Sequence, residues 1–281
     1  MTEPSTRTGR PDSSYSSSSV ERMAQHPNFA RFARAGFVMS GIVHLFIGYL
    51  AIRLALGNGG GTADQSGAMA ELAATPGGGV ALWIGVVAFT LMALWRLTEA
   101  VFGKASEPQA DSKKSEAVHR IKAAAVAVIY FGFALTAFGF ARGRGKSSSG
   151  ESKSLTARLM ENTAGTALLI IGGAVIIGVG GYHVYKGATR RFLKDLKGTP
   201  SKLVQRLGTA GYIAKGLAIG AVGALVILAV SQSDPDKASG LDGALKTLGA
   251  QPYGATLLVA AGLGIITYGL YNIVMARLAK M

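Results

Sequence analysis

The stretch Arg206-Leu-Gly-Thr-Ala-Gly211 opens a long apolar run, and two related stretches open apolar runs earlier in the chain. These are Arg31-Phe-Ala-Arg-Ala-Gly36 and Arg120-Ile-Lys-Ala-Ala-Ala125. A second apolar run follows each of them, and the copies lie about 87 residues apart. This period is longer than the periods of common soluble solenoids, and it suits a pair of membrane helices with their loops. The repeat therefore predicts one two-helix unit that occurs three times.

The composition is that of a membrane protein. Of the 281 residues, 49% are hydrophobic and 16% are charged, and the mean hydropathy is +0.34. This balance is too apolar for an ordinary soluble domain. Six runs approach the roughly 20 apolar residues that cross about 30 Å of hydrocarbon. The runs cover residues 35–56, 80–94, 123–141, 166–185, 207–230 and 256–274.

The repeat also divides the chain. Residues 1–27 are rich in Ser and Arg and have too little apolar content to fold, so we expect a disordered cytoplasmic tail. The three two-helix repeats are expected at 28–104, 117–198 and 203–281. The predicted fold is an all-α integral membrane protein with six transmembrane helices in three tandem two-helix repeats.

Short interfacial helices are expected in the outer loops. Between the two apolar runs of each repeat lies a segment with helical apolar spacing, preceded by a residue suited to an N-cap. The candidate N-caps are Ser66, Ser154 and Ser239.

Small residues recur at helical spacing inside the apolar runs. Gly216, Gly220 and Ala224, at i, i+4 and i+8, are one such strip. Strips of this kind let helices approach closely in lipid, where no hydrophobic force drives one helix against another. The glycine-rich fourth run, 166–185, is therefore expected to be the most buried span.

The distribution of Lys and Arg predicts the orientation in the membrane. Segments on the N-terminal side carry about 20 of these residues and the opposite loops about eight. Five of the eight lie in one loop, 142–158, which opposes the trend. The majority places both termini in the cytoplasm. The same residues are expected to attract anionic lipid headgroups, and their position beside helix ends argues against nucleic acid as a partner.

The residue inventory excludes several kinds of site. The chain has no Cys, which excludes disulfides, thiol nucleophiles, Cys-ligated zinc and iron–sulfur clusters. It has four His. The apolar runs hold no paired carboxylates, nucleophile–base pair or set of metal ligands. We therefore expect no enzymatic activity, no catalytic residue, no cofactor and no metal.

Polar side chains within the apolar runs are the candidate functional residues, because an uncompensated charge at mid-bilayer costs about 3 kcal/mol or more. His44 lies near mid-depth of the first run, and Lys215 lies one to two turns inside the fifth. His44 is either a proton relay or ligand site, or a neutral ring hydrogen-bonded to a neighbouring helix. Lys215 either pairs with a carboxylate or an anion, or extends to the interface along its long stem.

Four other residues complete the set of candidates. His183 and Asn272 lie toward the ends of the fourth and sixth runs, and with His44 and Lys215 they define a candidate polar path. Arg96 and Glu99 stand at i, i+3, which predicts an ion pair at a helix end.

The third copy resembles a known bacterial membrane family. The resemblance is carried by Asp234-Pro-Asp236, Gly240-Leu-Asp-Gly-Ala-Leu245, Gln251-Pro-Tyr-Gly254 and Tyr268-Gly-Leu-Tyr271. The family is the domain of unknown function, number twelve-oh-six, in which a two-helix unit occurs three times. The resemblance covers roughly residues 30–280 and is weakest in the second copy, which lacks the Pro-x-Gly turn. It implies a fold in the bacterial cytoplasmic (inner) membrane and no activity or site residue.

Two functions are consistent with these observations. The leading hypothesis is a structural or interaction role in the cell envelope, with lipids and another membrane protein as candidate partners. The alternative is a small channel or transporter with a polar path through the three-repeat bundle. Inverted repeats are the more common transporter design, and the three copies here run in parallel.

A topology reporter fused at Ser148 tests the predicted orientation. We expect the fusion to report a position outside the cytoplasm, because the Lys and Arg majority holds the opposite side of the membrane inside. A fusion after the last residue, which should report a cytoplasmic position, is the control. A cytoplasmic signal at Ser148 would contradict the orientation.

Overall fold

The computed structural model describes residues 27–58, 61–102 and 113–279. The predicted tail, 1–27, lies outside these residues except for Pro27, which begins the first helix. The elements are α2 (Pro27–Ala55), α3 (Gln65–Ala74), α4 (Gly78–Phe102), α5 (Lys113–Ala141), α6 (Ser148–Met160), α7 (Thr163–Ala188), η2 (Arg191–Asp195), α8 (Lys202–Ser231), η3 (Pro235–Lys237), α9 (Gly240–Gly249) and α10 (Gly254–Leu278).

Six of these helices are long and apolar enough to cross a membrane: α2, α4, α5, α7, α8 and α10. Five of them contain a whole predicted run, and α2 ends at Ala55, one residue before the end of the first run. Most extend beyond the predicted ends, as α4 does to Phe102. The predicted fold class is confirmed: the protein is an all-α integral membrane protein made of three tandem two-helix repeats. In every repeat a short helix (α3, α6 or α9) joins the two long ones.

The short helices begin differently from the prediction. Asp64 caps α3 by accepting a hydrogen bond from a backbone N–H, Ser147 caps α6 in the same way, and Ser239 precedes α9 without such a bond. Ser66 lies within the first turn of α3, and Ser154 lies inside α6. The prediction missed Asp64 because an Asp and a Ser are equally good caps, so sequence alone does not decide between neighbours.

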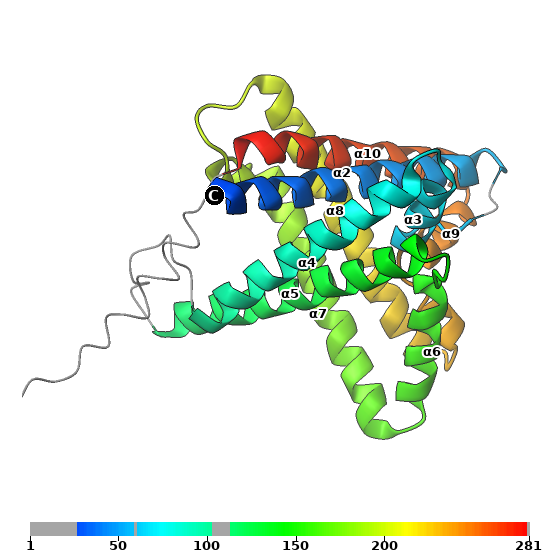
Figure 1. The fold of residues 1–281 in the computed structure, drawn as a ribbon. Coiled ribbons are helices and arrows are strands. Elements are labelled where there is room, and N and C mark those ends of the chain that lie inside the picture. Colours follow the sequence, from blue (N-terminus) through cyan, green and yellow to red (C-terminus); the bar gives the residue numbers. More distant parts are fainter. Residues whose placement is uncertain (1–26, 59–60, 103–112, 280–281) are drawn as a thin grey trace, which may run out of the picture.

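The long helices pair across repeats more closely than within them. The closest pairs are α2 with α10, α4 with α5 and α7 with α8. In Figure 1 the blue helix α2 runs along the red helix α10, so the first and last spans of the chain lie side by side. This pairing brings the third repeat back to the first and closes the bundle.

Glycines set the close approach of α7 to α8. A Cβ atom on Gly180 would lie 2.6 Å from the backbone oxygen of Gly216, and one on Gly223 would lie 2.7 Å from that of Gly173. These distances leave no room for any side chain. The two glycines on each helix are seven residues apart, so one face of α7 meets one face of α8 over two turns.

The same arrangement joins α10 to α2. A Cβ atom on Gly48 would lie 2.5 Å from the backbone oxygen of Gly262, and one on Gly269 would lie 2.8 Å from that of Gly41. The predicted role of small residues is therefore correct, but the spacing is seven residues, not four. The added Cβ of Gly220, a member of the predicted strip, would meet no atom within 4 Å.

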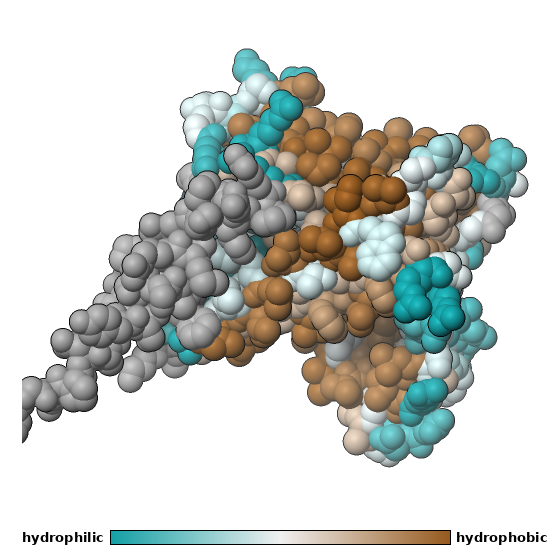
Figure 2. Space-filling model, viewed as in Figure 1, coloured by the Kyte–Doolittle hydropathy of each residue, from teal (hydrophilic) through white to brown (hydrophobic). Residues whose placement is uncertain are grey.

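The expectation that the fourth span is the most buried is wrong. The span in α7 is 22% buried, against 44% for the span in α2. The glycines of α7 point in several directions: Gly173 and Gly180 meet α8, whereas Gly178 and Gly181 have open space beside them. Apolar side chains cover much of the outer surface, and Figure 2 shows a brown surface between teal ends. This surface is suited to lipid.

Two alanine substitutions in α7 separate helix contact from helix propensity. We expect Gly180→Ala to lower the free energy of unfolding by about 1–3 kcal/mol, the usual cost of overpacking, because its Cβ would collide with backbone. Gly178→Ala has open space and should be neutral or stabilising. Thermal melting in detergent measures both, and equal melting temperatures would contradict the proposed contact.

Candidate functional site

The three short helices meet on one face of the bundle. We call α3, α6 and α9, with the few residues before each of them (η3 included), the cap. The cap lies opposite the face where α2 begins and α10 ends, which we call the terminal face (Figure 1). The basic segment 142–158, which opposed the charge rule, is largely α6 and so belongs to the cap.

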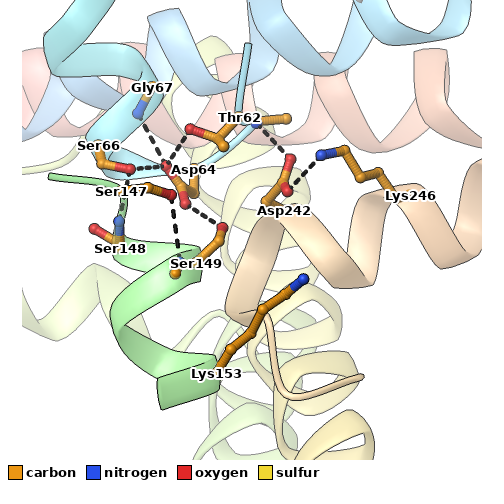
Figure 3. Close-up of polar contacts among 12 residues, drawn as sticks. Thr62, Asp64, Ser66, Gly67, Ser147, Ser148, Ser149, Lys153, Asp242 and Lys246 are labelled. Atoms are coloured by element: carbon orange, nitrogen blue, oxygen red, sulfur yellow. Dashed lines mark hydrogen bonds and ion pairs between the residues drawn. The ribbon is translucent and has the colours of Figure 1, made fainter. Parts of the chain in front are cut away.

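Asp64 is the centre of the polar contacts in the cap. Its Oδ1 accepts hydrogen bonds from Thr62 Oγ1 at 3.1 Å, Ser66 Oγ at 2.6 Å and the backbone N–H of Gly67 at 2.9 Å. Its Oδ2 accepts one from Ser149 Oγ at 2.7 Å. Figure 3 shows these donors around the carboxylate. Because Asp64 precedes α3 and Ser149 lies in α6, the buried carboxylate joins the first repeat to the second.

Two other contacts complete the connections between repeats. Asp242, in α9, is 3% exposed and accepts hydrogen bonds from the backbone N–H of Ala63 at 2.8 Å and from Lys246 Nζ at 2.7 Å. Lys153 of α6 forms an ion pair with Asp236 of η3 at 3.0 Å. Each repeat is thus bonded to both of the others at the cap.

A chamber of about 310 Å³ lies beneath the cap. Its walls come from α2, α4 and α5, with His44, Phe89 and Phe133 among the lining residues. The first residues of α3, α6 and α9 complete the lining and supply Gln65 and Ser152 among others. All three repeats therefore contribute to one cavity, and this cavity reaches the first predicted candidate, His44.

The ring of His44 is fixed by its own helix. Its Nδ1 lies 2.7 Å from the backbone oxygen of Ser40. A carbonyl oxygen only accepts hydrogen bonds, so Nδ1 is assigned as the donor, and the neutral ring then has an acceptor at Nε2. The expected hydrogen bond to a neighbouring helix is replaced by this bond within α2. The contact with another helix is a ring contact: the centroids of His44 and Tyr268 are 4.9 Å apart.

Tyr268 of α10 also binds Lys215 of α8. Lys215 Nζ donates a hydrogen bond to Tyr268 Oη at 2.8 Å and lies 4.4 Å from the centroid of the ring. Among the described residues, no Asp or Glu pairs with Lys215. The structure thus brings together His44 and Lys215, which lie on different helices, through a tyrosine that the sequence analysis did not select.

The other two candidates lie nearer the terminal face. Asn272 Nδ2 donates to the backbone oxygen of Tyr268 at 3.0 Å, within α10. His183 is half-buried, its Nδ1 lies 2.8 Å from the oxygen of Val179, and its ring stacks on Tyr212 at 6.0 Å. Tyr212 in turn lies 5.7 Å from Tyr268. Tyr212 therefore links His183 to the interior of the bundle.

An aromatic cluster fills the bundle toward the terminal face. Its rings belong to Phe192, Tyr212, Tyr268 and Tyr271. The backbone N–H of Lys197 donates to the oxygen of Leu278 at 2.7 Å, which holds the segment containing Phe192 against the end of α10. Tyr268, which binds Lys215, is a member of this cluster.

The predicted pair of Arg96 and Glu99 forms a contact. Arg96 Nη1 lies 2.6 Å from Glu99 Oε2, near the end of α4 on the terminal face. Within the described ranges, no three His, Asp or Glu residues gather as a metal site requires. The expectations of no metal, cofactor or catalytic residue stay predictions.

A sequence model described as Domain of Unknown Function (DUF1206) matches residues 35–103, 121–190 and 210–279. The chain belongs to this family. The three matched segments confirm the predicted threefold repeat, and each falls within one of the predicted repeat ranges. A protein of Bacillus subtilis (strain 168) named "Uncharacterized protein YxxB" is 29% identical over 255 residues, covering 88% of this chain and 90% of that protein. No solved structure matches.

Three functional candidates of this DUF1206 chain escaped the sequence analysis: Asp64, Asp242 and Tyr268. The two carboxylates lie outside the apolar runs. A charged residue is common there, so neither was selected as a candidate. Tyr268 lies inside a run, but an aromatic residue in a membrane helix is common. A stronger signal existed in Asp242 and Tyr268, because each stands in one of the segments that carry the family resemblance.

Substitution of Asp64 tests the cap of the DUF1206 bundle. Asp64→Ala leaves four donors without their acceptor, and a buried unpaired donor costs about 1–3 kcal/mol, so we expect a loss of about 2 kcal/mol or more. Asp236→Ala is the matched control, because it removes a carboxylate that is 81% exposed and should cost less than about 1 kcal/mol. Thermal melting compares the two, and equal losses would contradict the central role of Asp64.

Proposed function

We propose that this protein is a gated channel or transporter for a small solute. The observation that carries the proposal is the series of polar groups that begins at the chamber and continues through His44, Tyr268 and Lys215. These residues come from three different helices, yet they meet in the interior of the bundle. The sequence had ranked this function behind a structural or interaction role.

The energetic cost of the chamber and its polar groups favours a path over a scaffold. Space left between helices forgoes packing contacts, and buried polar groups are costly unless they are paired. A bundle whose only role is structural gains stability when apolar side chains fill such a space. The chamber and the polar residues below it are therefore better explained by a ligand or solute that uses them.

The aromatic cluster makes the path gated. Phe192, Tyr212 and Tyr271 pack between the polar residues and the terminal face, so a solute that passes must displace some of these rings. The hydrogen bond from Lys215 to Tyr268 connects α8 to α10 at the same level. We propose that breaking this bond accompanies opening of the gate.

The proposed setting is the bacterial cytoplasmic membrane with both termini in the cytoplasm. Basic side chains gather at the terminal face, where Lys122 lies 5.9 Å from the ring centroid of Tyr182 and Arg191 lies 4.9 Å from that of Tyr185. Cations beside exposed tyrosines suit the level of lipid headgroups. Anionic lipid is accordingly the proposed partner of this face, and no enzymatic activity is proposed.

The competing function is a structural or interaction role in the envelope. It predicts that vesicles containing the purified protein are no more permeable than protein-free vesicles. It also predicts a membrane protein that purifies with the chain in mild detergent. These outcomes together would displace the proposal.

Flux into proteoliposomes tests the path and its gate. Glycerol and urea entry is followed by light scattering, and potassium movement by a potential-sensitive dye. We expect Tyr268→Phe to raise the flux of the transported solute about tenfold, because it keeps the ring but removes the acceptor of a charged hydrogen bond. Tyr253→Phe, at an 86% exposed tyrosine of the loop before α10, is the control and should change nothing. Absence of flux of every probe in both the parent and Tyr268→Phe would overturn the proposal.

A further inference from the structure

This inference rests on the proposed function, in which the chamber is part of the path. The residues that line the chamber indicate the class of solute that it binds. We infer that the chamber binds a small, uncharged solute that both donates and accepts hydrogen bonds, such as a short polyol or a simple amide. The inference uses the size of the cavity, its hydrogen-bonding groups and the distribution of charge around it.

The size and the apolar walls set the scale of the solute. At about 310 Å³ the chamber lies at the lower end of the usual range for ligand pockets, about 300–1,000 Å³. Val43, Ile47, Phe89 and Phe133 form its apolar surface. A space of this size holds a small molecule and is too small for a whole membrane lipid.

Gln65 supplies an unused donor. Its side-chain nitrogen Nε2 is buried and has no hydrogen-bond partner within the described residues, and Gln65 lines the chamber. Buried polar atoms in proteins are nearly always paired, so an unpaired one needs an explanation. Nε2 itself is closed off from the chamber, so an acceptor oxygen of a bound solute becomes that partner when the Gln65 amide turns toward the cavity.

His44 and Ser152 supply the complementary groups. With Nδ1 donating to Ser40, the neutral imidazole of His44 has an acceptor at Nε2. Ser152 also lines the chamber, and its hydroxyl makes no hydrogen bond to any other described residue. A hydroxyl both donates and accepts, so a solute that does the same matches all three side chains.

Asp64 lines the chamber, and the acceptor positions of its carboxylate are already occupied. The carboxylate of Asp64 accepts four hydrogen bonds from fixed donors of the cap. Lys215 is bonded to Tyr268 and does not line the chamber. The carboxylate repels an anion, and its four neutral donors occupy the lone pairs that a cation would need. The lining therefore favours an uncharged solute over an anion or a cation.

The absence of Cys from the chain gives a direct test. Ser40→Cys places one thiol in the lining of the chamber, and N-ethylmaleimide modifies it in the full-length protein. We expect glycerol or acetamide to slow the modification, about threefold when the solute is at twice its dissociation constant. Tetramethylammonium and formate, which are of similar size and charged, should give no protection.

Two matched variants show where the protection arises. Gln65→Ala, in the Ser40→Cys background, should abolish it, whereas Gln251→Ala, at an exposed glutamine of the cap face, should leave it intact. Ser231→Cys, at the exposed end of α8, reports any effect of the solutes on the reagent itself. Ser148→Cys, at the first residue of α6, repeats the measurement if Ser40→Cys does not fold.

The outcomes separate this inference from the proposed function. Protection by neutral solutes without flux into vesicles supports the inference and overturns transport. Flux of potassium together with protection by tetramethylammonium supports transport and overturns the uncharged class. No reaction at either thiol, or protection that persists in Gln65→Ala, overturns the inference.

Discussion

The bundle depends on the direct approach of helix backbones at glycine. Gly173 and Gly180 meet Gly223 and Gly216, and the same geometry joins α2 to α10. In a membrane this approach supplies the dispersion contacts that burial from water supplies in a soluble protein. Because α10 reaches α2 in this way, three consecutive repeats close into one bundle. The cap, the chamber and the meeting of His44 with Lys215 all require that closure.

The cap shows how a buried charge serves specificity. Removing donors from Asp64 costs folding free energy, because its buried carboxylate is hydrogen-bonded to four fixed donors and no longer to water. Such a group tolerates one arrangement of α3 and α6 and penalises others. The carboxylate thereby fixes part of the roof of the chamber, which it also lines, and its four donors occupy its acceptor positions. One set of hydrogen bonds thus joins α3 to α6 and leaves the carboxylate of the lining without a free acceptor position.

Much of the fold was predictable from the sequence, and less of the site. Hydropathy and the repeat predicted six spans in three units, since each span must satisfy its own backbone hydrogen bonds in lipid. His44 and Lys215 were found because polar residues are rare and costly in that setting. Tyr268, which joins them, gave no such signal. Its role depends on a partner 53 residues away on another helix, and no local pattern encodes that distance.

The sequence by itself determined which segments enter the membrane, how often the unit recurs and which polar residues enter with it. These properties follow from local composition and from the thickness of a bilayer. Only the tertiary structure decided three features. They are the contacts at glycines spaced seven residues apart, the small buried share of α7 and the chamber beneath the cap. Each of these depends on which face of a helix meets which neighbour. In lipid that choice is made by the fit of surfaces between helices and not by hydrophobicity, because the membrane is as apolar as the helix faces it surrounds.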